Sequence, residues 1–459
     1  MKKYNVSDYG LVADGKTLVT ASLQKLVDKV CAEGGGEIVF EKGDFVLSTV
    51  YLKSGVKVRI EKGAKILGAL SFYDFDPEEK YDYQLYQDSS HSNFNCSMFV
   101  AKDCNDIAIT GDGVIDMRSV WDEDDVRQIK HRGPKCITLK SCNGVEISGI
   151  TILNATDLAV YFTDCDNVDI HGLDICVYID GISPDNSRNV KIYDCKVVAG
   201  DDAIVFKSSY NLNRLGVCKN IKVYNCDVTS RCNALKFGTE TNGGFEDIDI
   251  RNVKIRETRF AGIAVESVDG AKIDGIKIKD VTMKNVGTPI FVHLGKRLRG
   301  PEGTQIGRIQ NVTLENIKAE GPYVPYKTIP WNYFSYKADD VIQKPWTFGV
   351  GEGLDDTDED NENTAWQVSS NVCGLEGYPL KNITLKNIEL ILSGGANEFV
   401  RTVPEEAQSY PEVYVYGRVL PAKGIYFRHI DGLTLENVTV KTYRPDVRED
   451  FIFDDVKMK

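Results

Sequence analysis

The 459-residue sequence has no long hydrophobic run. No segment approaches the roughly 18 apolar residues that suggest a membrane-spanning helix. Residues 1–20 also lack the apolar stretch of a secretory signal peptide. We therefore expect a soluble, cytoplasmic protein with no membrane partner.

The chain is short of positive charge. It carries 55 Lys and Arg residues against 68 Asp and Glu residues, so its net charge is -13. Binding to a nucleic acid depends on basic side chains that neutralise phosphates. The charge balance predicts no nucleic-acid partner, and it argues against a polyanion unless a local basic groove compensates.

Metal-binding and disulfide patterns are missing as well. No two of the five histidines have the spacing of metal ligands, so we expect no catalytic metal and no cofactor. None of the twelve cysteines forms a C-x-x-C motif, and most stand inside apolar runs. Such cysteines are typical of small buried hydrophobic residues in a reducing compartment.

What the sequence does have is a repeat. A polar residue or glycine is followed by an aliphatic residue, any residue and a second aliphatic residue, as in N-G-V-E-I ending at Ile147 and R-N-V-K-I ending at Ile192. The shortest intervals between repeats are 22 and 23 residues. Such a period with short alternating strands predicts a parallel β-helix in which each repeat is one coil. The position five residues after each first aliphatic is apolar in nine successive repeats: Ile150, Leu173, Cys195, Cys226, Val253, Val281, Ile317, Ile388 and Val438.

The rest of the chain fits one all-β domain spanning residues 1–459. Within a cap region at residues 1–40, residues 21–32 predict an amphipathic helix that covers the open end of the coils. The repeat lapses at residues 320–380 and 393–422, and we interpret both segments as loop insertions. Three of the four tryptophans fall in the first, which favours a wall of a binding cleft.

Three aspartates lie in the segment 178–207. Twelve positions after the first aliphatic of successive repeats stand Asp157, Asp180, Asp202, Asn233 and Phe260. Asp180 and Asp202 should therefore be neighbours on adjacent coils, about 4.8 Å apart at the backbone, with Asp201 beside them. Crowded carboxyl groups raise one another's pKa, so one can donate a proton while another acts as a base. Glycosidic bond cleavage needs that division of labour, whereas Asp157 alone is typical of a turn.

These motifs resemble glycoside hydrolase family 28, the polygalacturonase-like enzymes, in its bacterial branch. The similarity rests on D-G-I-S-P-D-N-S-R-N-V from Asp180 and G-D-D-A-I-V-F-K from Gly200, and it extends over nearly the whole chain. It implies a right-handed parallel β-helix. It also implies that Asp201 donates the proton while Asp180 and Asp202 activate water, with inversion of the anomeric carbon.

The sequence departs from the family's pattern at the substrate-binding positions. Asn233 in C-N-A stands where the family has a histidine, and it cannot titrate. Ala264 and Glu266 in G-I-A-V-E replace the arginine and lysine that hold a galacturonate carboxylate. A glutamate there would repel that carboxylate, unless it is an ion-pair partner of Lys236 or Arg259.

Four further residues are candidates for substrate binding. Glu240 would accept hydrogen bonds from sugar hydroxyls, or it is a surface turn residue. Lys207 would reach the substrate or lower the pKa of an aspartate. His293 would line the cleft or serve the structure, and Trp121 would offer an apolar face to a sugar ring or pack at the edge of the core.

We therefore expect an inverting glycosidase for a neutral or deoxy sugar, or for a pectin-derived oligosaccharide, rather than for polygalacturonate. The alternatives are an exo-polygalacturonase, a β-helix polysaccharide lyase or epimerase, and a non-catalytic carbohydrate-binding β-helix. The sequence does not determine the oligomeric state.

Overall fold

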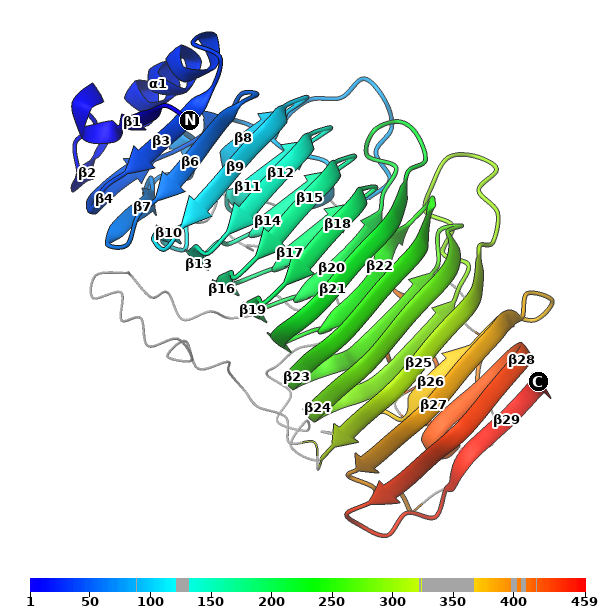
Figure 1. The fold of residues 1–459 in the computed structure, drawn as a ribbon. Coiled ribbons are helices and arrows are strands. Elements are labelled where there is room, and N and C mark those ends of the chain that lie inside the picture. Colours follow the sequence, from blue (N-terminus) through cyan, green and yellow to red (C-terminus); the bar gives the residue numbers. More distant parts are fainter. Residues whose placement is uncertain are drawn as a thin grey trace.

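The computed structural model describes residues 1–87, 89–120, 132–321, 323, 367–397, 403–405, 410–417 and 419–459. Almost all regular structure in these residues is β-strand, and the strands pair in parallel along the whole length of the chain. The coils rise in one direction, so the two termini lie at opposite ends of an elongated solenoid (Figure 1). This is the predicted parallel β-helix.

The strands form three parallel stacks. The first contains β1(Lys3–Asn5), β3(Gly36–Phe40), β6(Val56–Ile60), β9(Asn105–Gly111), β12(Asn143–Ser148), β15(Asp166–His171) and β18(Arg188–Tyr193). The second contains β2(Asp14–Leu18), β4(Gly43–Leu47), β7(Ala64–Gly68), β10(Val114–Asp116), β13(Thr151–Leu153), β16(Asp174–Val177) and β19(Lys196–Ala199). The third contains β5(Val50–Tyr51), β8(Ser97–Lys102), β11(Lys135–Lys140), β14(Val160–Thr163), β17(Ile182–Asp185), β20(Ile204–Ser208), β22(Leu235–Thr241) and β26(Ser370–Cys373).

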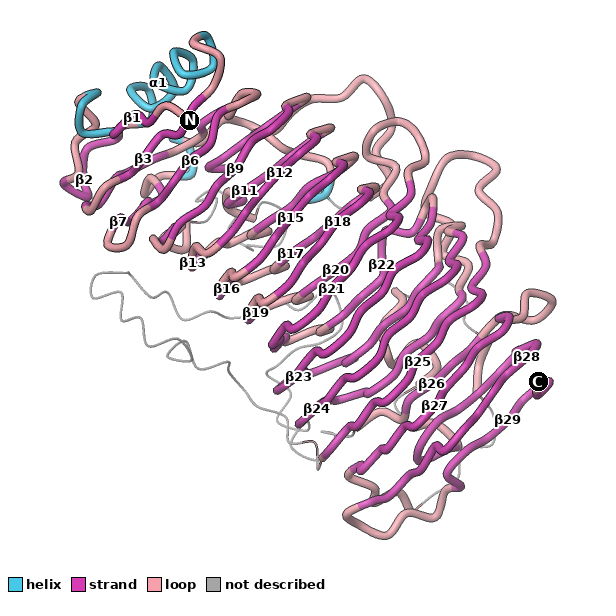
Figure 2. Tube along the Cα trace, in the orientation of Figure 1, coloured by secondary structure: helices cyan, strands magenta, loops and turns pink. Residues whose placement is uncertain are grey.

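Longer strands in the C-terminal half turn the corner between two or three stacks without a break, as the continuous magenta segments show in Figure 2. They are β21(Val217–Ser230), β23(Gly244–Ser267), β24(Lys272–Leu294), β25(Arg308–Glu320), β27(Leu380–Leu392), β28(Ala422–Thr442) and β29(Glu449–Met458). Strand β26 falls inside the segment 320–380, so the third stack continues through the end of that segment. Its tryptophans lie outside the described residues.

The polar residue of each repeat has a structural cause. Asn189, Asn220, Asn311 and Asn382 adopt positive φ angles one position before the first aliphatic residue of their repeats, a conformation that asparagine tolerates. Their side chains bond from coil to coil, with Nδ2 of Asn220 2.6 Å from Oδ1 of Asn189. The motif therefore combines a residue at positive φ with the first buried aliphatic residue.

The core is a continuous column of apolar side chains inside the coils. The aligned position five residues after the first aliphatic is confirmed as an interior column, because Cys226 pairs with Val253 and Val253 with Val281 on successive coils. All twelve cysteines are free, and ten of them are buried. Helix α1(Thr20–Ala32) lies at the N-terminal end of the solenoid and buries Leu23, Leu26, Val27 and Val30. Among the described residues, no helix has the length and apolar character needed to cross a membrane.

The register corrects two positions of the predicted aspartate column. Val160 pairs with Ile182, and Leu235 pairs with Ile263. Counting back two residues places Leu158, not Asp157, beside Asp180, and Ala261, not Phe260, beside Asn233. The spacing between coils changes by one residue at these corners, so a fixed offset from the repeat motif fails there.

Candidate active site

The three aspartates meet at the corner that leads into the third stack. Asp180 stands two residues before β17, and Asp201 and Asp202 stand just before β20. One carboxylate oxygen from each lies within 4.8 Å of the others. Asp180 and Asp202 are 3% exposed, and Asp201 is half-buried. The predicted cluster therefore exists, and its geometry follows from the 22-residue coil between Asp180 and Asp202.

The surroundings separate the protonation states of the three acids. Burial raises the pKa of Asp202 to about 6, although Lys236 opposes the rise. Burial and the negative charge of Asp180 raise the pKa of Asp201. Burial acts on Asp180 too, but His91 and Lys207 outweigh it and leave its pKa below the usual value. The site thus holds an ionised Asp180 beside two carboxyl groups that retain protons more readily, as acid and base catalysis requires.

On the C-terminal side of the acids, three carboxyl groups surround Lys236. Its Nζ lies 2.8 Å from Oε1 of Glu412, 3.6 Å from Oδ2 of Asp202 and 3.8 Å from Oε1 of Glu266. Glu266 is fully buried, and neither of its oxygens has a hydrogen-bond partner among the described residues. Burial raises its pKa well above the usual value, and Glu412 and Asp202 raise it further. This side of the site is rich in negative charge.

Asn233 forms hydrogen bonds with both Asp202 and Glu412. Its Nδ2 donates to Oδ1 of Asp202 at 2.9 Å and to Oε2 of Glu412 at 3.4 Å, while its Oδ1 accepts from the backbone N–H of Ala261 at 3.0 Å. The amide therefore orients Asp202 without titrating.

On the other side of the acids, Glu240 is held by two cations. Nζ of Lys207 lies 2.8 Å from its Oε2, and Nη2 of Arg299 lies 2.7 Å from its Oε1. Burial alone would raise the pKa of Glu240, but Lys207, His91 and Arg299 lower it well below its usual value. Glu240 is buried, which removes the interpretation as a surface turn residue.

Packed side chains bound the site at both ends along the solenoid axis. Before the acids, Phe94 packs with Leu158 and Tyr161 in one buried cluster. Beyond them, a second cluster joins residues of the third stack to residues just before β28. It contains Ala261, Ala264, Phe291, Cys373, Tyr426, Val413, Tyr416, Leu420 and Ala422. The acids therefore lie between Leu158 of the first cluster and Ala261 of the second, which stand beside Asp180 and Asn233 on neighbouring coils.

The remaining predicted residues fall outside the acid cluster. His293 is the neighbour of Glu266 on the next coil, and its Nδ1 lies 2.5 Å from the hydroxyl of Tyr416. Burial lowers the pKa of His293 to about 3, so it stays neutral. Asp157 pairs with Lys135, whose Nζ lies 3.2 Å from its Oδ2. Trp121 lies outside the described residues.

Sequence reasoning missed two residues of the site. Glu412 belongs to the Y-P-E motif of the second insertion, and His91 belongs to a short 3-10 turn that lies more than eighty residues before Asp180. Neither segment follows the repeat, so no periodic signal could place them.

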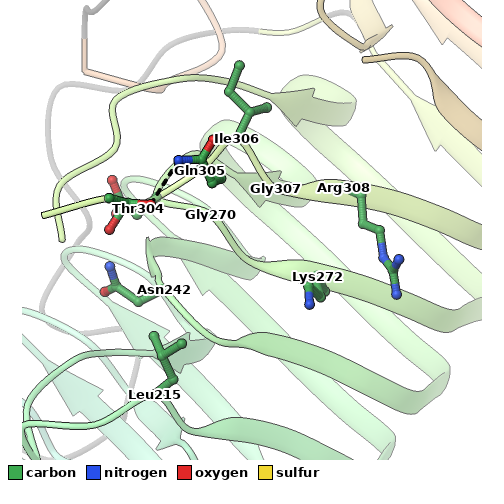
Figure 3. A pocket seen from close by; sticks show the side chains of 11 residues that line it. Leu215, Asn242, Gly270, Lys272, Thr304, Gln305, Ile306, Gly307 and Arg308 are labelled. Carbon is green, nitrogen blue, oxygen red and sulfur yellow. Dashed lines mark hydrogen bonds between the residues drawn. The ribbon is translucent and has the colours of Figure 1, made fainter. Parts of the chain in front are cut away.

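A separate hollow of about 260 Å³ opens among the turns around Asn242, Gly270 and Thr304 (Figure 3). Asn242, Lys272 and Arg308 are among its lining residues, but none of the three clustered aspartates is. Its one acidic residue, Asp269, is bound by Arg297, with Nε 2.9 Å from Oδ1. This hollow lacks the acid and base groups needed for hydrolysis.

A parallel β-helix with buried, differently protonated carboxyl groups on one face belongs to the class of β-helix glycosidases. The sequence model of "Glycosyl hydrolases family 28" matches residues 36–323. A "Probable polygalacturonase" of Vitis vinifera is 25% identical over 415 residues, which cover 85% of this chain and 74% of that protein. The chain belongs to glycosyl hydrolase family 28 and is a glycosidase.

Two solved structures share the fold. An exopolygalacturonase from Thermotoga maritima matches with a TM-score of 0.67 and 18% identity, over 95% of this chain and 92% of that one. A family 28 exopolygalacturonase from Yersinia enterocolitica matches with a TM-score of 0.68 and 17% identity, over 99% of this chain and 78% of that one. At these identities the likeness concerns the fold.

Proposed function

We propose that this protein hydrolyses an O-glycosidic bond to a neutral or deoxy sugar, or the terminal bond of a pectin-derived oligosaccharide, and that polygalacturonate is a poor substrate. Asp201 donates the proton to the leaving oxygen, and Asp180 and Asp202 activate water. The substrate is a carbohydrate, and the reaction takes place in the cytoplasm.

The observation that carries the substrate class is the set of three carboxyl groups around Lys236. Burial raises the pKa of Glu266 well above its usual value, and the negative potential of Glu412 and Asp202 raises it further, although Lys236 opposes the rise. A uronate carboxylate in the same place would meet the same potential, so its binding would be unfavourable. Four cations near the site are already paired: Lys207 and Arg299 with Glu240, Lys236 with Glu412, and Arg297 with Asp269.

The packed clusters at the two ends support a short substrate. The coils of Asp180, Asp202 and Asn233 lie between them and span about 10 Å at about 4.8 Å per coil. We expect release of sugars from a chain end, which can be read from the products of an oligosaccharide labelled at its reducing end.

An exo-polygalacturonase is the second candidate, because two structures of the same fold carry that name. It needs a cation for the galacturonate carboxylate, and Lys236 would have to exchange Glu412 for the substrate.

The deciding experiment compares kcat/KM for aryl α-rhamnoside, α-galactoside, β-galactoside and α-galacturonide with that for an oligogalacturonide at one pH and salt concentration. A neutral glycoside should be the best substrate. An oligogalacturonide better by about tenfold, or about 1.4 kcal/mol, would refute the proposed substrate class. Full activity in EDTA without an unsaturated, ultraviolet-absorbing product excludes a lyase, and glycan binding without any turnover would indicate a binding module.

A further inference from the structure

His91 is a buried residue whose ring faces Asp180 and Glu240, and it lowers the pKa of both carboxyl groups. It is 4% exposed, and neither of its ring nitrogens has a hydrogen-bond partner among the described residues. Nδ1 lies 4.0 Å from Oε2 of Glu240, and Nε2 lies 3.7 Å from Oδ2 of Asp180. Both distances exceed the 2.7–3.2 Å of an ordinary N–H···O hydrogen bond.

The main chain at His91 is fixed by buried polar groups. The backbone carbonyl of His91 lies 2.7 Å from the hydroxyl of Tyr161 and accepts from Nδ2 of Asn211 at 3.0 Å. Nδ2 of Asn211 also lies 2.8 Å from Oδ2 of Asp185, which anchors the amide to β17. The imidazole packs edge-on against Tyr161 with the ring centroids 5.6 Å apart. The ring is therefore held in place although, within the part of the chain that the structure describes, its nitrogens make no hydrogen bond, which is unusual for a buried polar side chain.

The 4.0 Å between Nδ1 of His91 and Oε2 of Glu240 is a separation that one bridging hydroxyl oxygen can span. Glu240 is kept ionised by Lys207 and Arg299, so its oxygens only accept hydrogen bonds. A hydroxyl oxygen about 2.8 Å from both atoms would accept from Nδ1–H and donate its own proton to Oε2 of Glu240. A carboxylate of the substrate could not do so, because it has no proton to donate.

We propose that His91 and Glu240 together bind one hydroxyl of the substrate sugar, so that His91 is a specificity-determining residue supplied by the 89–91 turn. This inference rests on the proposed function for the identity of the ligand as a sugar. A sugar that binds next to Asp180 would therefore need a hydroxyl group at this position.

The test measures binding, so it does not depend on turnover. In the Asp201→Asn protein, L-rhamnose, D-galactose and D-galacturonate are titrated by calorimetry, with and without His91→Phe, which keeps the aromatic packing on Tyr161. His171→Phe is the matched control, because His171 lies in the first stack and stacks on Tyr193 at 4.8 Å. We expect His91→Phe to weaken the tightest sugar by about tenfold or more, and His171→Phe to leave it unchanged. A deoxy analogue of that sugar, without the hydroxyl that His91 binds, should have the same affinity for the protein with His91 and for the protein with His91→Phe.

His91→Gln offers a second variant that keeps one N–H donor, and it should restore part of the affinity. Unchanged sugar affinity in folded His91→Phe and His91→Gln would overturn the proposal, as would the failure of all three sugars to bind. His91→Phe can also be made in the enzyme that keeps Asp201. A lower kcat with unchanged sugar affinity in that variant would also overturn the proposal, because His91 would then hold the water and not the sugar. Sugar binding that depends on His91 in a protein without turnover would reject the proposed hydrolysis and leave the role of His91 intact.

Discussion

Replacing Glu412 by glutamine should make the enzyme less selective against uronates. Glu412 lies 2.8 Å from Nζ of Lys236, which also faces Asp202 and Glu266. Three carboxyl groups thus surround one ammonium group. Burial raises the pKa of Glu266 and that of Glu412, and Lys236 opposes both rises. Glutamine at position 412 removes one acidic group and keeps an oxygen that can accept from Lys236.

The expected size follows from the charge that a uronate would meet. One unit charge at about 5 Å with an effective dielectric constant of about 20 gives about 3 kcal/mol of repulsion. That energy corresponds to a discrimination on the order of 100-fold in kcat/KM. In Glu412→Gln the ratio of kcat/KM for a neutral glycoside to that for α-galacturonide should fall by about 10- to 100-fold.

The assay measures both substrates with wild type, Glu412→Gln and Glu389→Gln. Glu389 is the matched control, since it loses the same charge but lies on β27 beside Lys318 and Lys441. The ratio should stay constant in the control. If Glu412→Gln also leaves it constant while the protein remains folded, the negative potential around Lys236 does not set the substrate class.

The other predictions concern the acids themselves. Asn in place of Asp180, Asp201 or Asp202 should lower the rate by about 10²- to 10⁴-fold without unfolding the protein, and near-normal turnover by Asp201→Asn on a glycoside with a poor leaving group would contradict the mechanism. Proton NMR of the first-formed anomer should show inversion, as the family resemblance implies. The carboxylate oxygens lie within 4.8 Å of one another, which is closer to the roughly 5–5.5 Å typical of retaining enzymes than to the roughly 6.5–9.5 Å of inverting ones. Retention would therefore identify one aspartate as a nucleophile. If Asp202 is a base, kcat/KM should rise as the pH passes about 6, where burial places its pKa, because the carboxylate is then ionised; a fall over the same range would make Asp202 the proton donor.

The sequence alone determined the solenoid and its acid cluster. Short-range rules were enough. Asparagine, aspartate or glycine at positive φ precedes the first aliphatic residue of each repeat. Parallel stacking converts a spacing of 22 residues into contact between Asp180 and Asp202. Glu266 lies near Lys236 because the two residues stand on strands of adjacent coils, β23 and β22. A fixed offset failed only where a corner gained or lost a residue, as at Leu158 and Ala261.

Only the tertiary structure decided which non-repeating segments complete the site. Glu412 reaches Lys236 across 176 residues of sequence, and Asn211 binds the carbonyl of His91 across 120. Such contacts depend on how segments outside the repeat fold back over the third stack, where Tyr161 and Tyr416 are buried. The protonation of the acids was decided in the same way, because the pKa of a carboxyl group depends on its burial and on charges from segments that no periodicity connects.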